Sequence, residues 1–184
     1  MAGTEPHHSL ALPSFEAPVK LLIVVAPYYR DIADALIAGA TATAARAGAT
    51  CETVEVPGAL EIPTAIALAH RHANFDGYVA LGCVIRGETT HYETVCNDSS
   101  RGLMWLGLQG ALTGNGILTV ENRDQAVVRA DPDGQDKGGG AAAAALHLIA
   151  LARRWGQPKG TVGFRPAEGE FRIAGDGTEG PQRA

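Results

Sequence analysis

The chain has 184 residues, which is enough for one domain with a sizeable core and too few for two comfortable ones. Its formal net charge of −5 at pH 7 provides no basic surface for nucleic acid or anionic lipid, so neither is expected as a partner. Hydrophobic residues make up 46% of the chain but aromatic residues only 5%, so small aliphatic side chains and some of the 23 glycines must pack the core.

The cysteines and the early apolar run bear on where the protein works. Cys51, Cys83 and Cys96 are odd in number and lack metal-ligand spacing, which fits reduced thiols in a cytoplasm. The run at 21–26 follows no cationic start, and it is far shorter than the roughly 18 apolar residues of a membrane span. We therefore expect a cytoplasmic protein that is not inserted in a membrane.

The first half of the chain predicts an arm followed by two strand–helix units. Residues 1–18 lack sustained periodicity and are expected to form a flexible arm. The continuous β-prone run at 20–26 predicts a strand buried on both faces, and apolar residues at helical spacing predict a helix over 31–47. A second strand is expected at 51–56, followed by a helix over 63–72 with a proline in its first turn.

The second half continues the alternation. It predicts a buried strand at 77–85, a long helix over 90–108 and a fourth strand at 116–120. Helices are expected at 123–130 and 138–155, the latter ending in two arginines that favour a helix carbonyl end. Strands that alternate with helices imply a parallel sheet covered by helices on both faces.

The richest candidate loop lies after the third strand. Ligands of parallel sheets gather at the carboxyl ends of the strands. There Gly87 lets the backbone turn, and Thr89 and Thr90 place hydroxyls at a helix start, where unpaired amides favour an anion such as phosphate. From spacing alone, an ordinary capped helix is the favoured explanation of the same residues, because glycine-threonine turns are common caps. His91, just inside that helix, is a candidate for proton transfer near neutral pH, although a histidine there is more often structural.

Other strand ends add further candidates. Glu61, after the second strand, either accepts hydrogen bonds from a polyol or complements the dipole of the next helix. Tyr28 and Tyr29, after the first strand, offer a ring that stacks on a heterocycle, with core packing of one of them as the alternative. Arg129 and Lys137 supply cations for a phosphate or a polarised carbonyl, unless both are simply solvated.

Taken in order, these loops resemble the lumazine synthase family from about Leu21 to Trp155. The matching blocks are Val-Pro-Gly-Ala-Leu-Glu-Ile-Pro from 56, Gly-Cys-Val-Ile-Arg-Gly-Glu-Thr-Thr-His-Tyr from 82, Gly-Ile-Leu-Thr-Val-Glu-Asn from 116 and Lys-Gly from 137. The resemblance implies a flavodoxin-like, three-layer α/β sandwich around a four-stranded, mostly parallel sheet. It places one domain at 19–156. The glycine-rich, polar composition at 157–184 predicts a disordered C-terminal tail.

The resemblance also implies an activity. Members condense 5-amino-6-(D-ribitylamino)uracil with 3,4-dihydroxy-2-butanone 4-phosphate to 6,7-dimethyl-8-ribityllumazine, releasing phosphate and water, in riboflavin biosynthesis. No metal or organic cofactor is expected, because the amine and the ketone react once they are held together. Members form pentamers, some of which assemble into larger shells, so a homo-oligomer with an inactive monomer is expected.

Site roles carry over residue by residue. The resemblance implies that Tyr28 stacks on the ring of the ribityl-aminouracil. It assigns binding of this substrate to Tyr28, Ala59, Glu61, Val84, Ile85, Asn115 and Lys137. It assigns the phosphate to Gly87, Glu88, Thr89, Thr90 and Arg129, and proton transfer to His91. Arg129 and Lys137 are expected from the neighbouring subunit. The chain departs from the family at Pro27 and at Asn115. It also departs at Gly140, the position where other members carry an acid that supports the histidine.

Two other interpretations remain open from the sequence. One is a paralogue that binds a lumazine or flavin without turnover, or serves mainly as an assembled shell. The joint presence of Glu61, His91, Arg129 and Lys137 favours the enzyme, since a mere binder has no need of the phosphate cations. The other is a flavodoxin-like mononucleotide module, which requires a longer phosphate loop after the first strand than this chain has.

Overall fold

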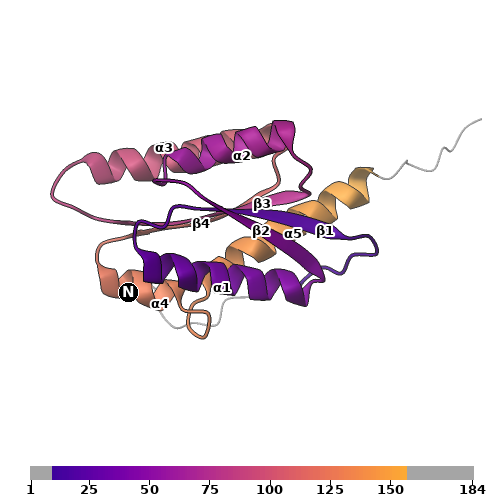
Figure 1. The fold of residues 1–184 in the computed structure, drawn as a ribbon, viewed down its shortest axis with the longest axis horizontal. Helices are drawn as coiled ribbons and strands as arrows, with labels where there is room; N and C mark the ends of the chain where they lie inside the picture. The colour runs from indigo at the N-terminus through magenta and orange to yellow at the C-terminus, as the bar shows by residue number, and fades with distance from the viewer. Residues whose placement is uncertain (1–9, 157–184) are drawn as a thin grey trace, which may run out of the picture.

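The computed structural model describes residues 10–156, which form a sheet between two layers of helices (Figure 1). The strands are β1 (Val19–Val25), β2 (Ala49–Glu55), β3 (Gly77–Ile85) and β4 (Thr113–Val120). The helices are α1 (Arg30–Arg46), α2 (Glu61–His72), α3 (His91–Leu108), α4 (Arg123–Ala130) and α5 (Lys137–Gly156). The predicted alternation is confirmed, and β4 is longer than expected because it begins at Thr113.

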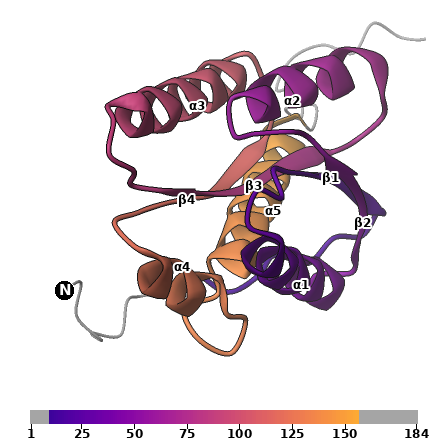
Figure 2. The same ribbon diagram turned by 60° about the vertical axis from the view of Figure 1, so that its left-hand side comes forward.

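The four strands are all parallel and lie in the order β2-β1-β3-β4. Helices α2 and α3 cover one face of the sheet, and α1, α4 and α5 cover the other (Figure 2). The chain therefore leaves β1 toward one face and β3 toward the opposite face. Loops that diverge in this way from neighbouring parallel strands open a crevice at the carboxyl edge of the sheet.

The two central strands separate two apolar clusters. Leu21, Ile23 and Val25 of β1 pack with α1, α4 and α5, while Leu22 and Val24 pack with α2 and α3. This alternation follows from the pleat of a strand, whose successive side chains point to opposite faces. The continuous apolar run predicted as a doubly covered strand is thus confirmed for β1.

Helices cover both faces of the sheet, as predicted, but they leave the carboxyl half of the edge strand β2 exposed. All four residues at 52–55 are exposed, including Val54. The reason is topological, because β2 has a neighbour on one side only and the helices centre on β1 and β3. Its mixed sequence of Glu, Thr and Val fits such an edge.

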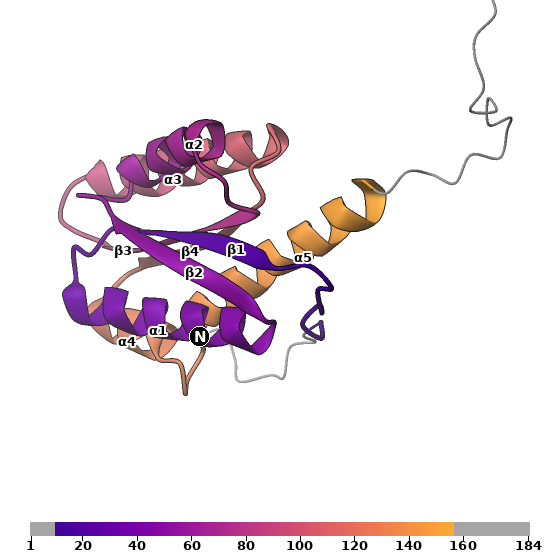
Figure 3. The ribbon, with the colours of Figure 1, turned by 45° about the vertical axis from the view of Figure 1, so that its right-hand side comes forward.

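Small residues bring α5 against its neighbours, as the composition predicted. A Cβ added to Gly114 of β4 would lie 1.9 Å from the carbonyl oxygen of Ala141, and one added to Gly138 would lie 2.1 Å from that of Leu36. Backbone occupies the space that a side chain would need at both positions. Figure 3 shows α5 crossing under the sheet and reaching beyond it.

The segment before β1 has no helix or strand over residues 10–18, yet it contacts the core. Leu12 and Phe15 pack against the cluster beneath α1 and α5, and the guanidinium of Arg153 donates to the carbonyl oxygens of Ala17 and Pro18 at 2.9 and 2.8 Å. The rest of the predicted arm, 1–9, and the predicted tail, 157–184, lie outside the described residues. No helix within 10–156 is long and apolar enough to cross a lipid bilayer.

Candidate functional site

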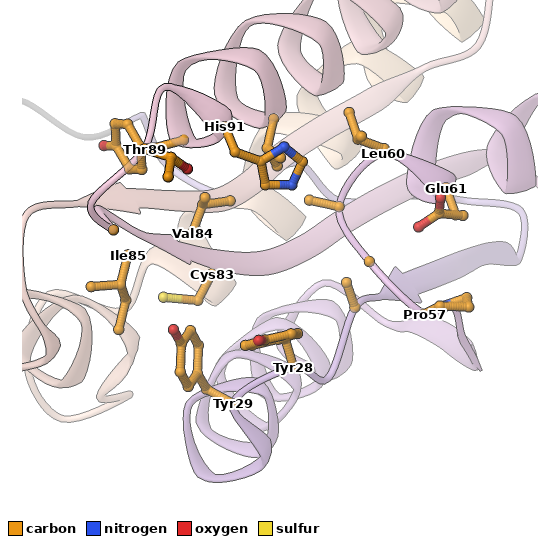
Figure 4. Close-up of a pocket in the computed structure, with 16 residues that line it drawn as sticks. Tyr28, Tyr29, Pro57, Leu60, Glu61, Cys83, Val84, Ile85, Thr89 and His91 are labelled. Carbon is orange, nitrogen blue, oxygen red and sulfur yellow. The ribbon is translucent and has the colours of Figure 1, made fainter.

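A cavity of about 560 Å³ lies at the carboxyl edge of the sheet, where the loops after β1, β2 and β3 converge. Figure 4 shows its lining side chains, with the tyrosines after β1 facing the start of α3 across the end of β3. This is the crevice that the opposite exits of β1 and β3 create. The three strand-end loops whose residues were singled out in the sequence therefore meet in one place.

The loop after β1 gives its two tyrosines different environments. Tyr29 packs against the apolar core, and burial raises the pKa of its phenol. Tyr28 has 76% of its surface exposed, and its ring meets that of Tyr29 edge to face at a centroid distance of 5.0 Å. The core-packing alternative thus applies to Tyr29, although its ring also lines the cavity. Tyr28 retains an open face that a planar heterocycle could stack on.

The loop after β2 places a carboxylate and a small side chain on the opposite wall. Ala59 is buried, and Glu61 is the exposed first residue of α2. A Cβ on Gly58 would lie 3.0 Å from Oε2 of Glu61, so the carboxylate lies back over the turn. No side chain caps α2. Glu61 can therefore complement the helix dipole and still accept hydrogen bonds from a polyol at the pocket wall.

The end of β3 forms the floor. Val84 and Ile85 line the cavity, as predicted, and Cys83 lines it as well. Burial raises the pKa of the Cys83 thiol to about 11, so the sulfur stays protonated at neutral pH. The sequence analysis missed Cys83 as a lining residue. Its position two residues before Ile85 on the same strand is the signal that could have found it.

The start of α3 forms the upper wall and is not capped by a side chain. The helix begins at His91, and its N-cap residue Thr90 makes no side-chain hydrogen bond to the first turn. Gly87, Thr89 and His91 line the cavity, whereas Glu88 and Thr90 are exposed beside it. The imidazole of His91 points toward the space above Val84 (Figure 4). The capped-helix alternative is therefore wrong for Thr90, and amides at this helix start remain available to an anion.

Arg86, between β3 and this loop, is a residue that the sequence analysis missed. Its Nε donates to Oε2 of Glu121 at 2.7 Å, and its Nη1 donates to Oε1 of Glu93 at 2.6 Å. The guanidinium lies 4.2 Å from the ring centroid of Tyr92. Hydrogen bonding to Arg86 lowers the pKa of the Glu93 carboxyl. The available signal was an arginine directly after a strand with an acid in the next helical turn.

Besides Glu88 and Thr90, three predicted residues do not line the cavity of their own chain. Asn115 lies within β4, where its side-chain oxygen accepts a hydrogen bond from the amide of Ile117 at 3.0 Å. Arg129 bonds a backbone carbonyl inside α4, and Lys137 is the exposed first residue of α5. Helices α4 and α5 lie on the face opposite α3 (Figure 2). If these residues serve such a cavity, it must be the cavity of another copy of the chain.

The assembled wall combines an aromatic face, a carboxylate, an imidazole and an open helix start. Such a set can hold a planar heterocycle, a polyol and an anion together, with the imidazole in position to move protons. Among residues 10–156, no group of three His, Cys, Asp or Glu side chains could hold a metal ion.

Comparisons with known proteins agree with this site. The family model described as 6,7-dimethyl-8-ribityllumazine synthase matches residues 18–153. A protein of that name from Jannaschia sp. (strain CCS1) is 58% identical over 95% of this chain and 97% of its own length. Another, from Novosphingobium aromaticivorans, is 58% identical over 74% of this chain and 98% of its own length. "6,7-Dimethyl-8-ribityllumazine synthase 1" of Rhizobium meliloti is 53% identical over 77% of this chain and 97% of its own length. The chain belongs to the 6,7-dimethyl-8-ribityllumazine synthase family.

Proposed function

We propose that this protein is a transferase of riboflavin biosynthesis that joins 5-amino-6-(D-ribitylamino)uracil to 3,4-dihydroxy-2-butanone 4-phosphate. The product is 6,7-dimethyl-8-ribityllumazine, with release of phosphate and water. The observation that carries this proposal is the meeting of an exposed aromatic ring, a carboxylate and an uncapped helix start in one cavity of a family member.

The ribityl-aminouracil would occupy the part of the cavity between the first two loops and β3. Tyr28 would stack on the pyrimidine, while Ala59 and Glu61 would hold the ribityl chain. Val84 and Ile85 would line the pyrimidine pocket with side chain and backbone. The exposure of Tyr28 supports this assignment, because a ring already packed on both faces has no surface left for stacking.

The sugar phosphate would bind at the start of α3. Gly87, Glu88, Thr89 and Thr90 form the loop that would receive the phosphate, and the missing side-chain cap leaves helix amides for it. No lysine or arginine side chain lines the cavity among the described residues. We infer that Arg129 of a neighbouring subunit supplies the positive charge for the phosphate. Lys137 and Asn115 would reach the ribityl-aminouracil from a neighbouring subunit too.

The chemistry follows from this placement. The 5-amino group attacks the ketone and loses water to form an imine, and phosphate is then eliminated. The ribitylamino nitrogen attacks the remaining carbonyl carbon and closes the ring with loss of a second water. His91 lies at the helix start beside the proposed phosphate, where its imidazole would pass protons between these steps. Much of the acceleration would come from holding two intrinsically reactive partners together, so no metal or organic cofactor is required.

A homopentamer is the proposed working form. Helix α3 exposes a cluster of large apolar side chains, which is unusual for a monomeric protein. The exposed fractions are 68% for Met104, 56% for Trp105 and 81% for Leu108. Burial of this surface between copies would also bring the cations of one subunit to the cavity of the next. The three free cysteines support a reducing, cytoplasmic setting.

A steady-state assay tests the proposed activity. The purified full-length protein is given both substrates, and lumazine absorbance is followed against the uncatalysed rate. Saturable turnover well above background supports the synthase. Tight binding of a lumazine or flavin with background turnover would instead indicate a non-catalytic paralogue.

The Arg129→Ala variant tests the proposed phosphate cation. The KM for the sugar phosphate should rise about tenfold or more, while that for the ribityl-aminouracil stays within about twofold. Arg71→Ala is the matched control, because Arg71 is exposed in the last turn of α2 and does not line the cavity. Equal losses for both substrates would count against a phosphate role for Arg129.

A further inference from the structure

Arg86 joins three segments at the edge of the cavity. Its backbone amide donates to the carbonyl oxygen of Val120, the last residue of β4, at 2.9 Å. Its side chain binds Glu121, just after β4, and Glu93, in the first turn of α3. One residue thus connects the end of β3, the end of β4 and the start of α3.

The contacts of Arg86 leave its guanidinium already engaged. Nε and Nη1 each bind a different carboxylate, and the ring of Tyr92 lies against the guanidinium. Arg86 does not line the cavity, although the loop 87–90 that follows it borders the cavity. These contacts fit a residue that acts on its neighbours, and not one that reaches a ligand itself.

The charges of Arg86, Glu93 and Glu121 affect an anion that binds nearby. Glu93 lies two residues after His91, so its carboxylate belongs to the same helical turn as the imidazole. Without Arg86, two carboxylates would be left unpaired beside the place where a phosphate dianion is proposed to bind. The loop 87–90 would also lose the hydrogen bonds by which the residue before it, Arg86, holds the first turn of α3 and the end of β4.

We propose that Arg86 is a positioning residue: by binding Glu93 and Glu121 together, it holds the loop 87–90 and the first turn of α3 in the shape that receives phosphate. The proposal rests on the proposed function, because it concerns the same phosphate site. It goes further by naming a residue outside the cavity whose removal impairs that site.

The test measures the affinity of the assembled, full-length protein for inorganic phosphate by isothermal titration calorimetry. Arg86→Met removes the charge and both hydrogen bonds while keeping an unbranched side chain. It should weaken phosphate binding about tenfold, the usual scale for losing charge-assisted hydrogen bonds. In turnover, the KM for the sugar phosphate should rise, while the KM for the ribityl-aminouracil stays within about twofold.

A double-mutant cycle separates positioning from direct contact. In a Glu93→Gln/Glu121→Gln background, Arg86→Met should cost about twofold or less, because the carboxylates through which Arg86 acts are gone. If Arg86 touched phosphate directly, the loss would be as large in that background as in the parent protein. That result would overturn the inference.

Two controls complete the experiment. Arg71→Met removes one positive charge from the exposed last turn of α2, away from the cavity, and should leave phosphate binding unchanged. Arg86→Lys replaces Arg86→Met in the cycle if the latter does not assemble, since an ammonium keeps the charge but lacks the planar fork that holds two carboxylates. If the parent protein binds no phosphate, the proposed phosphate site itself is overturned. If the parent protein binds phosphate but the effects of the Arg86 and glutamate substitutions are additive, only the role of Arg86 is overturned.

Discussion

Two helix starts in this molecule are built in opposite ways. At α5, Oδ1 of Asp136 accepts a hydrogen bond from the amide of Gly139 at 2.8 Å, and Gly138 lies against the backbone of α1. At α3, Thr90 makes no side-chain cap, and His91 and the preceding loop face a cavity. A helix start whose amides are satisfied internally stabilises the fold, whereas one left open can serve a ligand.

The largest expected effect is at the packed start of α5. Gly138→Ala should lower the free energy of unfolding by about 3 kcal/mol, because the new Cβ would meet the Leu36 carbonyl and force α5 from α1. Thermal and denaturant unfolding measure the loss. Gly140→Ala is the control, since a Cβ there meets nothing within 4 Å and alanine should stabilise the helix by about 0.5–1 kcal/mol. Equal stability of the two variants would contradict the packing argument.

At the open start of α3, the expected effect is on catalysis. His91→Ala should lower kcat by roughly 10²-fold or less, the usual value of a proton-transfer group, while the sugar phosphate still binds. His91 is exposed, so the melting temperature should change little. Single-turnover and steady-state kinetics on the assembled protein separate the chemical step from binding. Unchanged turnover would remove His91 from the mechanism.

The smallest expected effects are those of substituting the residues that precede the two helices, Asp136 before α5 and Thr90 before α3. Asp136→Ala should cost about 1–2 kcal/mol of unfolding free energy, because it removes a cap at a backbone φ of 41°. Asp136→Asn, which keeps the accepting oxygen and tolerates that φ, should cost less. Thr90→Ala should change stability by less than about 0.5 kcal/mol, since its hydroxyl caps nothing. A larger loss for Thr90→Ala than for Asp136→Ala would reverse the comparison.

Much of the fold could be predicted because its signals are local. The apolar run of β1 and the breaks at glycine and proline located its strands and helices to within a few residues. β4 was the main exception, since Gly114 gives no strand signal and is accommodated only because Ala141 of α5 lies directly against it. The exposed edge at β2 was also missed, because strand order depends on crossovers and not on local periodicity.

The candidate site, like the fold, could be predicted only in part from the sequence. Tyr28, Glu61, Gly87 and His91 could be nominated because each lies at a strand end, and the structure brings them to one cavity. The roles proposed for Asn115, Arg129 and Lys137 depend on a second copy of the chain, which no pattern within one chain can place. The link from Arg86 to Glu121 joins residues 35 positions apart, so it becomes visible only when β3 and β4 lie side by side.

By itself, the amino-acid sequence determined the alternation of strands and helices, the family and the set of chemical groups available for catalysis. These follow from short-range periodicity and from residue types at strand ends. The tertiary structure alone decided which tyrosine packs against the core, which helix start stays uncapped and which carboxylates Arg86 binds. Each of these depends on the distance between segments far apart in the chain, and that distance is set by strand order and packing.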